Sequence, residues 1–142
     1  MSRVITLTTD FGTSDGYVAS VKGVILGINP QAKIVDITHA IEPQSIMQSA
    51  FILHTAWRYF PKGTIHLCVI DPGVGGHRQA IILKTPSAIF VTPDNGTLSY
   101  ILHELSSEET THSSGRAVRR ALPEGCEAVS ITNKEYFRHP VS

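Results

Sequence analysis

The sequence predicts an α/β fold: a three-layer sandwich in which helices flank a mostly parallel, mixed sheet. Two observations predict it. Segments rich in Ile, Leu, Val and Thr alternate with segments of helical spacing over residues 4–70, and turns with Gly, Asp and Pro separate them. A strand-helix-strand-helix-strand order is typical of a parallel α/β unit.

The first half of the chain supplies this alternation. The helical segments each carry an apolar stripe, and Asn29-Pro30 ends the first of them. The strand that follows the second helix is apolar throughout, as expected of a central strand buried on both faces. We therefore expect strands at Val4–Thr9, Lys33–Thr38 and Thr64–Ile70, and helices at Tyr17–Ile28 and Pro43–Trp57.

The second half is less regular. Strands are expected at Ala80–Lys84 and Ala88–Thr92, close enough in sequence to form a hairpin, which makes the sheet mixed. A helix is expected at Thr97–Leu105, and a last strand at Glu127–Thr132. The polar segment between these two elements is expected to be a surface connection, with a short helix near Arg116 to Leu122.

Length and composition point to one globular domain. The chain has 142 residues, 42% of them hydrophobic, and twelve basic residues balance twelve acidic ones. This balance gives no electrostatic reason to expect a nucleic-acid partner, and no stretch is apolar enough to suggest a membrane span. Of the two cysteines, Cys68 lies in an apolar run and is expected to be a buried thiol, so a reduced, cytoplasmic protein is expected.

Three acidic turns follow apolar strands, at Asp10, Asp71 and Asp94. Ligands of open α/β sheets bind outside the carboxyl ends of the strands, so these turns would share one edge if the strands are parallel. Asp10 is a candidate for the two hydroxyls of a ribose. The alternative is that Asp10 caps the next helix or closes a local turn.

Asp71 is followed, seven residues on, by Arg78. An arginine beside a carboxylate keeps it ionised and oriented, and an ionised carboxylate can orient a water molecule and accept its proton. The alternative is a surface ion pair in a turn. Gly73 and its neighbouring glycines would let the backbone approach a ligand, although the pattern is neither a phosphate loop nor a dinucleotide fingerprint. Asn95 could read an adenine edge or a substrate carboxylate with its amide.

A metal-dependent hydrolase is a further alternative. Asp36, His39 and His66 could join Asp10 and Asp71 around a metal ion. Asp36 and His66 lie within expected strands, where neighbouring side chains alternate between faces, and this argues against a shared site. The sequence assigns no role to Asp94, Asp36 or His39.

Five motifs in this order resemble the S-adenosylmethionine (SAM) hydroxide adenosyltransferases, also called SAM hydrolases, which are relatives of the SAM-dependent fluorinase and chlorinase. The resemblance extends from about Ile5 to Val141. The motifs are Thr9-Asp10-Phe11-Gly12, Asp36-Ile37-Thr38-His39, Phe60-Pro61-Lys62-Gly63-Thr64-Ile65-His66, Asp71-Pro72-Gly73-Val74-Gly75 with Arg78, and Pro93-Asp94-Asn95-Gly96.

The resemblance implies that SAM is the substrate, that water attacks its ribose C5′, and that no metal or cofactor is needed. By resemblance Asp71 and Arg78 are catalytic, whereas Asp10, Phe11, Gly73, Asn95 and Asn133 contact the substrate. It also implies a homotrimer, in which the ligand lies between the N-terminal domain of one subunit and a C-terminal β-barrel domain of its neighbour.

The resemblance favours water over halide as the nucleophile. Halogenases carry a Tyr at the position of Asp71 and a Thr at the position of Val74, and the fluorinase has an inserted loop between the regions of Arg78 and Pro93. The catalytic histidine of the hydrolases and the barrel domain would follow Ser142. Residues 1–142 are therefore expected to be the N-terminal SAM-binding domain alone. The alternatives are a halogenase-like enzyme and a non-catalytic nucleoside-binding domain.

Overall fold

A computed structural model describes residues 3–110 and 122–137 of the chain. The elements in chain order are β1 (Val4–Thr9), α1 (Tyr17–Ile28), β2 (Lys33–Thr38), α2 (Ile46–Ala56), η1 (Trp57–Tyr59), β3 (Thr64–Val69), β4 (Ala80–Lys84), β5 (Ala88–Pro93), α3 (Ser99–Thr110), β6 (Glu127–Ser130) and η2 (Lys134–Tyr136). The short helix expected near Arg116 to Leu122 falls on residues 116–121, outside the described ranges, apart from its last residue.

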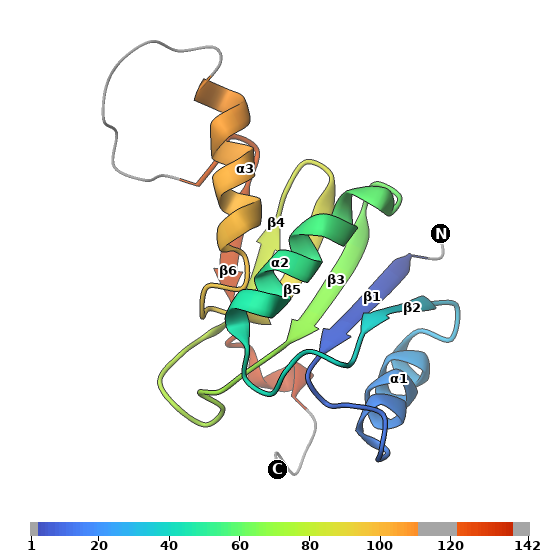
Figure 1. The fold of residues 1–142 in the computed structure, drawn as a ribbon. Coiled ribbons are helices and arrows are strands. Elements are labelled where there is room, and N and C mark those ends of the chain that lie inside the picture. The colour runs from blue at the N-terminus through green and yellow to red at the C-terminus, as the bar shows by residue number, and fades with distance from the viewer. Residues whose placement is uncertain (1–2, 111–121, 138–142) are drawn as a thin grey trace.

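The strands form one sheet in the order β2-β1-β3-β5-β4-β6 (Figure 1). β1 pairs in parallel with β2 and β3, and β3 pairs in parallel with β5. β4 is antiparallel to both of its neighbours, β5 and β6. The prediction of a mostly parallel, mixed sheet is confirmed.

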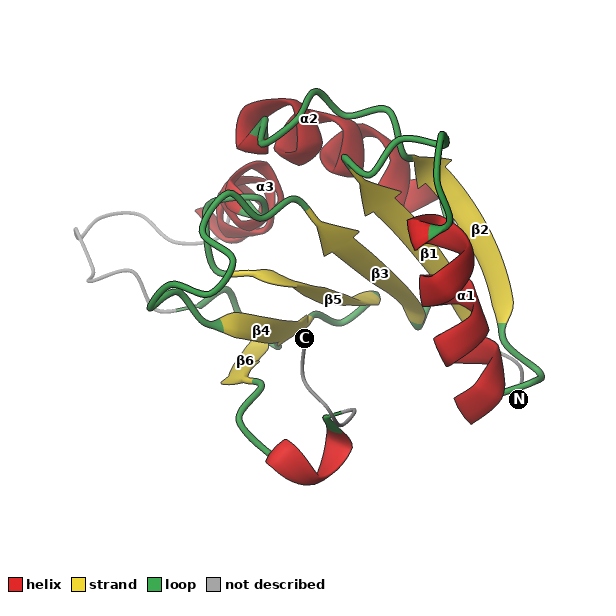
Figure 2. Ribbon diagram, turned by 90° about the horizontal axis from the view of Figure 1, so that it is seen from below, coloured by secondary structure: helices red, strands yellow, loops and turns green. Residues whose placement is uncertain are grey.

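The helices lie on both faces of this sheet, as predicted for a three-layer sandwich. Figure 2 shows α2 and α3 on one face, and α1 on the other face beside β1 and β2. The crossover from β1 to β2 and the crossover from β2 to β3 therefore use opposite faces. This arrangement is typical of a doubly wound sheet.

The hydrophobic core lies between the sheet and the helices α2 and α3. Phe90 of β5 is fully buried, and its ring packs edge-on against Trp57 at 5.5 Å and stacks on His66 at 5.1 Å. Trp57 is 5% exposed. The buried cluster comprises Ile41, Leu53, Trp57, Cys68, Ile70, Leu83, Ala88, Phe90, Leu98 and Ile101.

The opposite face of the sheet is covered less completely. Leu7 of β1 is buried there, but none of the residues of α1 is buried. The strand residues beyond β1 on this face alternate with the core residues and are only half-buried, namely Ile65, Leu67, Val69, Ile89 and Val91. Most of the stabilising burial therefore comes from the α2–α3 side.

Two helix boundaries differ from the predicted ones by more than two residues. α2 starts at Ile46 and not at Pro43, because Gln44 has a left-handed backbone (φ 64°) that no helix contains. Ser45 is the N-cap, and its side chain accepts from the Gln48 N–H. α3 extends past Leu105 to Thr110. In this added segment the hydroxyls of Ser106 and Ser107 donate to the carbonyls four residues earlier, so both side chains find hydrogen-bond partners within the helix.

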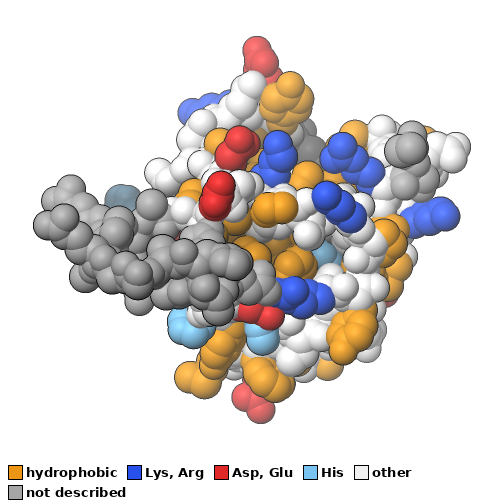
Figure 3. Space-filling view, turned by 90° about the horizontal axis from the view of Figure 1, so that it is seen from above, with side chains coloured by type: hydrophobic (Ala, Val, Ile, Leu, Met, Phe, Trp, Pro, Cys, Tyr) orange, Lys and Arg blue, Asp and Glu red, His pale blue; other side chains and the backbone are white. Residues whose placement is uncertain are grey.

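Charged side chains are mixed on the surface. Figure 3 looks onto the end of the molecule where the parallel strands begin, and it shows Lys and Arg interspersed with Asp and Glu. Within the described ranges, the helices are too short or too polar to cross a membrane. Cys68 and Cys126 are free thiols, and Cys68 is fully buried, as predicted.

His66 is a buried histidine of β3 that touches no ligand-binding turn. Its Nδ1 lies 2.8 Å from the Thr6 hydroxyl on β1, and its Nε2 has no hydrogen-bond partner among the described residues. Burial lowers the pKa of His66 from 6.5 to about 4. The folded protein therefore holds this ring neutral over a pH range in which the unfolded chain protonates it.

This difference in pKa makes stability depend on pH. Between pH 6.5 and about 4 the unfolded chain binds more protons at this residue, so acidification favours unfolding. Above pH 6.5 the ring is mainly neutral in both states, so its burial causes little loss of stability there. Between pH 7 and pH 4.5, protonation of His66 in the unfolded chain should lower the free energy of unfolding by roughly 2 kcal/mol. Urea denaturation at a series of pH values measures it.

The His66→Asn variant keeps a polar atom near Thr6 but removes the titrating ring, so its stability should fall less steeply over this pH range. The exposed His103→Asn variant is the matched control and should keep the wild-type slope. Equal slopes in wild type and His66→Asn would contradict the prediction.

Candidate active site

The three acidic turns meet at one edge of the sheet. Asp10 follows β1, Asp71 follows β3, and Asp94 follows the last paired residue of β5, and these strands are adjacent and parallel. β6 runs in the same direction as β5, because β4 is antiparallel to both, so Asn133 also follows a strand that ends at this edge. The predicted convergence is confirmed at the level of the strands.

Asp10 and Asp71 flank the point where the strand order reverses. β2 lies on one side of β1 and β3 on the other, and the connecting helices lie on opposite faces (Figure 2). In open α/β sheets, ligands bind in the crevice at such a switch point, outside the carboxyl ends of the strands. This location is therefore the candidate site.

Asp10 is anchored by a distant backbone group. Its Oδ2 accepts a hydrogen bond from the Gln44 N–H at 2.8 Å. Gln44 is the one non-glycine residue with positive φ in the described ranges, and it immediately precedes the N-cap of α2. Backbone outliers of this kind cost free energy and cluster at functional sites. The left-handed conformation of Gln44 directs its N–H toward the Asp10 carboxylate.

The local alternatives for Asp10 do not match the structure. The N-cap of α1 is Gly16, and no side chain caps that helix. The local turn is closed by Asp15, whose Oδ1 accepts from the Tyr17 N–H at 3.0 Å. With Oδ2 held by Gln44, Asp10 has no hydrogen bond at Oδ1 within the described part of the chain. The Gln44 N–H thus fixes the orientation of the Asp10 carboxylate.

Phe11 follows Asp10 and forms one side of the same turn. Its ring is half-buried and lies 5.8 Å from the ring of Tyr17, which is 66% exposed. Gly12 has a φ of 71° and donates its N–H to the His39 carbonyl at 2.8 Å. This left-handed position suits glycine and directs the chain back toward the end of β2.

Asp71 and Arg78 form the ion pair that their spacing predicted. Arg78 Nε donates to Asp71 Oδ1, and Arg78 Nη2 pairs with Asp71 Oδ2. The two side chains are only 12% and 24% exposed, respectively. Two parallel contacts fix the plane of the carboxylate and favour its ionised form.

Gly73 lies beside the Asp71–Arg78 pair in this loop. A Cβ at residue 73 would lie 3.4 Å from Arg78 Cγ, which is an ordinary van der Waals contact, so the arginine stem does not require glycine at this position. The expectation that Gly73 approaches a ligand stays a prediction. Its observed neighbours are the two charged side chains themselves.

Asn95 braces the neighbouring turn. Its Nδ2 donates to the Ile70 carbonyl at 2.8 Å, and its Oδ1 accepts from the Thr97 N–H and hydroxyl at 3.2 and 2.8 Å. The amide thus ties the end of β3 to the residues before α3. Asn133 instead caps the short helix η2, where its Oδ1 accepts from the Glu135 N–H at 3.0 Å on the surface. Substrate contact by either residue stays a prediction.

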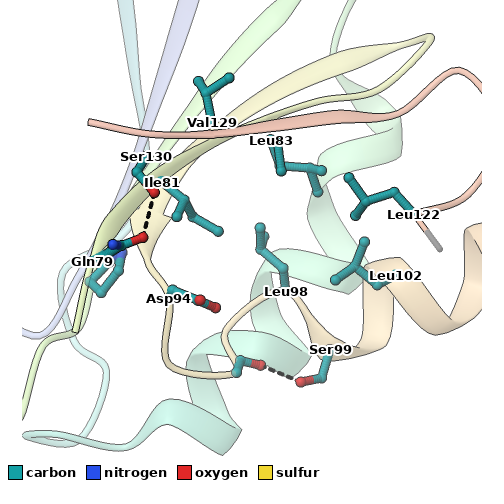
Figure 4. Close-up of a pocket in the computed structure, with 13 residues that line it drawn as sticks. Gln79, Ile81, Leu83, Asp94, Leu98, Ser99, Leu102, Leu122, Val129 and Ser130 are labelled. Carbon is teal, nitrogen blue, oxygen red and sulfur yellow. Dashed lines mark hydrogen bonds between the residues drawn. The ribbon is translucent and has the colours of Figure 1, made fainter. Parts of the chain in front are cut away.

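Asp94 borders a pocket on the core face of the sheet (Figure 4). This pocket of about 420 Å³ lies between β4, β6 and α3. Leu83, Leu98 and Leu102 form much of its apolar wall, and Gln79 Oε1 accepts from the Ser130 hydroxyl at its rim. Asp71 and Asp10 are not among the lining residues, so Asp94 stands apart from the two carboxylates at the switch point.

The metal-site alternative gains no support from side-chain positions. Across residues 3–110 and 122–137, no three His, Cys, Asp or Glu side chains are placed to hold a metal ion. His66 lies in the core, whereas Asp36 and His39 contact each other and not Asp71.

Residues 5–132 match the family model described as the SAM hydroxide adenosyltransferase N-terminal domain. The chain belongs to this family. The match includes both carboxylates at the switch point and the arginine paired with Asp71.

Named relatives of the SAM hydroxide adenosyltransferase family agree with this assignment. The (R)-S-adenosyl-L-methionine hydrolase of Methanocaldococcus jannaschii is 49% identical over 107 residues, which cover 72% of this chain and 40% of that protein. The fluorinase of Actinoplanes sp. is 27% identical over 85% of this chain and 48% of that protein. The chain thus spans less than half the length of these relatives.

A solved structure shares the fold. The crystal structure of an uncharacterized conserved protein from Thermotoga maritima is 44% identical, with a TM-score of 0.69, over 70% of this chain and 39% of that chain.

The contacts of Gln44 and Thr9 at the site were not predicted, and His39 was considered only as a possible metal ligand. Gln44 contributes its backbone N–H and not its side chain, so its residue type gives no sign of the contact with Asp10. Thr9 and His39 lie within recognised motifs, but their contact joins residues thirty positions apart.

The contacts of Asn95 predict a structural cost that Asn133 does not share. Asn95→Ala leaves the Ile70 carbonyl and the Thr97 donors without their partner, and it should lower the free energy of unfolding by about 1–3 kcal/mol. Asn133→Ala is the matched control, and its exposed cap should cost less than about 1 kcal/mol. Urea denaturation followed by circular dichroism measures both. Equal losses would show that Asn95 does not brace the turn.

Proposed function

We propose that this chain is the SAM-binding N-terminal domain of a hydrolase that converts SAM and water to adenosine and L-methionine. The observation that carries the proposal is the placement of Asp10 and the Asp71–Arg78 pair on either side of the switch point. The hydrolase names of the relatives that are 40–49% identical support it.

Asp10 would bind the ribose. A carboxylate can accept hydrogen bonds from two vicinal hydroxyls, as acidic residues do in dinucleotide sites. Gln44 holds Oδ2 through one lone pair, so Oδ1 and the remaining lone pair of Oδ2 would be available to the ribose hydroxyls. Phe11, next in the chain, would pack its half-buried ring against the nucleoside.

Asp71 would orient the attacking water. Arg78 keeps the carboxylate ionised and fixed in plane, so that it can accept a hydrogen bond from water in line with the C5′–sulfur bond. The water oxygen forms the bond to C5′ as the C5′–S bond breaks, and the bonding pair leaves with sulfur. Methionine departs as a neutral thioether, and the water proton passes to Asp71 and then to solvent.

The electrostatics of the step suit a site with little water. A hydroxide-like nucleophile and a sulfonium cancel charge in the transition state, so exclusion of solvent favours reaction. The step needs no redox chemistry and no Lewis acid, and SAM is the only ligand proposed apart from water. The proposal extends to a cytoplasmic homotrimer in which a second domain completes the pocket around residues 1–142.

Two other functions share parts of this site. A halogenase-like activity is favoured by the fluorinase relatives, but their identity of 27–28% is well below that of the hydrolases. The anionic Asp71 would also repel a halide ion. A non-catalytic nucleoside-binding domain would keep Asp10 and bind adenosine without releasing methionine, so product analysis separates it from the hydrolase.

The role of Asp71 predicts a selective loss of turnover. With the complete protein and SAM in halide-free buffer, Asp71→Asn should reduce adenosine and methionine release by on the order of 100-fold or more, while SAM affinity changes little. Chromatography of the products measures release, and calorimetry measures binding. Asp94→Asn, at the end of the next strand, is the control and should retain activity. Unchanged release by Asp71→Asn would remove Asp71 from the mechanism.

The role of Asp10 predicts a change in nucleoside preference. Asp10→Ala should weaken adenosine binding by on the order of tenfold and leave binding of 2′,3′-dideoxyadenosine nearly unchanged, because only adenosine offers the two hydroxyls. Asp15→Ala is the control, since that carboxylate accepts from the Tyr17 N–H on the surface. Equal weakening for both nucleosides would argue against ribose recognition by Asp10.

A further inference from the structure

Thr9 is the last residue of β1 and directly precedes Asp10. It is 2% exposed, so its hydroxyl is shielded from solvent. The Thr9 Oγ1 lies 2.8 Å from His39 Nδ1 and accepts a hydrogen bond from the Phe11 N–H at 3.2 Å. One hydroxyl thus joins the residue after Asp10 to a histidine at the end of β2.

His39 connects this hydroxyl to a pair of charged side chains. Its ring is buried, and its Nε2 lies 3.1 Å from Asp36 Oδ1. The other oxygen of Asp36 accepts from Lys22 Nζ of α1 at 2.6 Å. Partial burial acts to raise the pKa of Asp36, but the hydrogen bonds and charges of Lys22 and His39 outweigh it and lower that pKa below its ordinary value.

These contacts favour one direction for the hydrogen bond between Thr9 and His39. An ionised Asp36 can only accept, so the 3.1 Å contact favours a proton on His39 Nε2, although this contact is an ion-pair approach and does not have the geometry of a hydrogen bond. In the neutral ring Nδ1 is then an acceptor, and the Thr9 hydroxyl donates to it. The lone pairs of Thr9 Oγ1 are left to accept from the Phe11 N–H.

The same histidine also holds the turn through its backbone. The His39 carbonyl accepts from the Gly12 N–H at 2.8 Å. The N–H groups of the two residues that follow Asp10 are therefore both fixed, one by the Thr9 hydroxyl and one by the His39 carbonyl. Asp10 itself accepts from the Gln44 N–H, so three hydrogen bonds from different partners hold the turn.

We propose that Thr9 is a positioning residue for the nucleoside-binding turn, and that the series His39, Asp36 and Lys22 holds its hydroxyl in place. This inference rests on the proposed ribose contact of Asp10. The adjacent Thr8 provides a natural contrast, because it is equally buried but its hydroxyl has no hydrogen-bond partner in the described ranges. Burial of a threonine hydroxyl at the end of β1 does not by itself create the network.

The test compares substitutions of Thr9 and Thr8 in the 142-residue chain. Thr9→Val removes the hydroxyl with little change of shape, Thr9→Ser retains it, and Thr8→Val removes the hydroxyl that has no partner. Calorimetry measures the affinity of each variant for adenosine and for 2′,3′-dideoxyadenosine. Thr9→Val should lose on the order of fivefold to tenfold in adenosine affinity and none in dideoxyadenosine affinity. Thr9→Ser and Thr8→Val should behave as wild type.

The outcomes separate this inference from the proposed function. A wild-type chain that binds both nucleosides equally would overturn the ribose contact of Asp10 and this inference with it. A wild-type preference for adenosine that survives in Thr9→Val would overturn the positioning role alone. Parallel losses for both nucleosides in Thr9→Val would assign Thr9 a merely structural role and would also overturn it.

A second measurement needs no ligand. Nitrogen-15 NMR of the His39 ring should report the Nε2–H tautomer in the wild-type chain, because a proton on Nε2 lies beside the Asp36 carboxylate. The Nδ1–H tautomer would reverse the hydrogen bond to Thr9 and overturn the proposed arrangement.

Discussion

The hydrogen bond between Thr6 and His66 is the interaction on which the geometry of the site depends. It joins β1 to β3 within the core, at a position where the two residues are also paired in the sheet. A slip of β1 by one residue would turn its side chains to the opposite face and separate this buried pair. The register then continues to the pair Thr9 and Val69, so that Asp10 lies one residue beyond the paired region and Asp71 two. The relative placement of the two carboxylates is therefore set inside the sheet.

Much of the fold could be predicted because its signals are local. Apolar stripes and strand composition located every strand to within two residues, and Asn29-Pro30 ended α1 correctly. The start of α2 was missed because Gln44 adopts a left-handed conformation that side-chain pattern does not encode for a non-glycine residue. The end of α3 was missed because serines that favour turns also fit a helix when their hydroxyls bond to the carbonyls of the preceding turn.

The site was predictable where residues close in sequence form it. Asp71 and Arg78 belong to one loop, so their spacing sufficed. The partners of Asp10 and Thr9 are set by tertiary structure, since Gln44 and His39 come from the segment between β2 and α2. Strand alternation argued against a shared metal site for Asp36 and His66, but it could not predict that His39, which follows the end of β2, contacts Asp36. Only the folded chain brings these groups into one network.

The buried Cys68 thiol can be used to detect local opening of the folded chain. Burial and the charge of Asp10 raise the pKa of the Cys68 thiol to about 12, against a small opposing effect of the Ser49 hydroxyl. Alkylating reagents attack the thiolate, so the native thiol is protected both by exclusion from solvent and by protonation. The rate at which Cys68 is modified therefore measures how often α2 separates from β3, at the end of the sheet where Asp10 lies. A ligand that closes this region would slow that labelling without touching the sulfur.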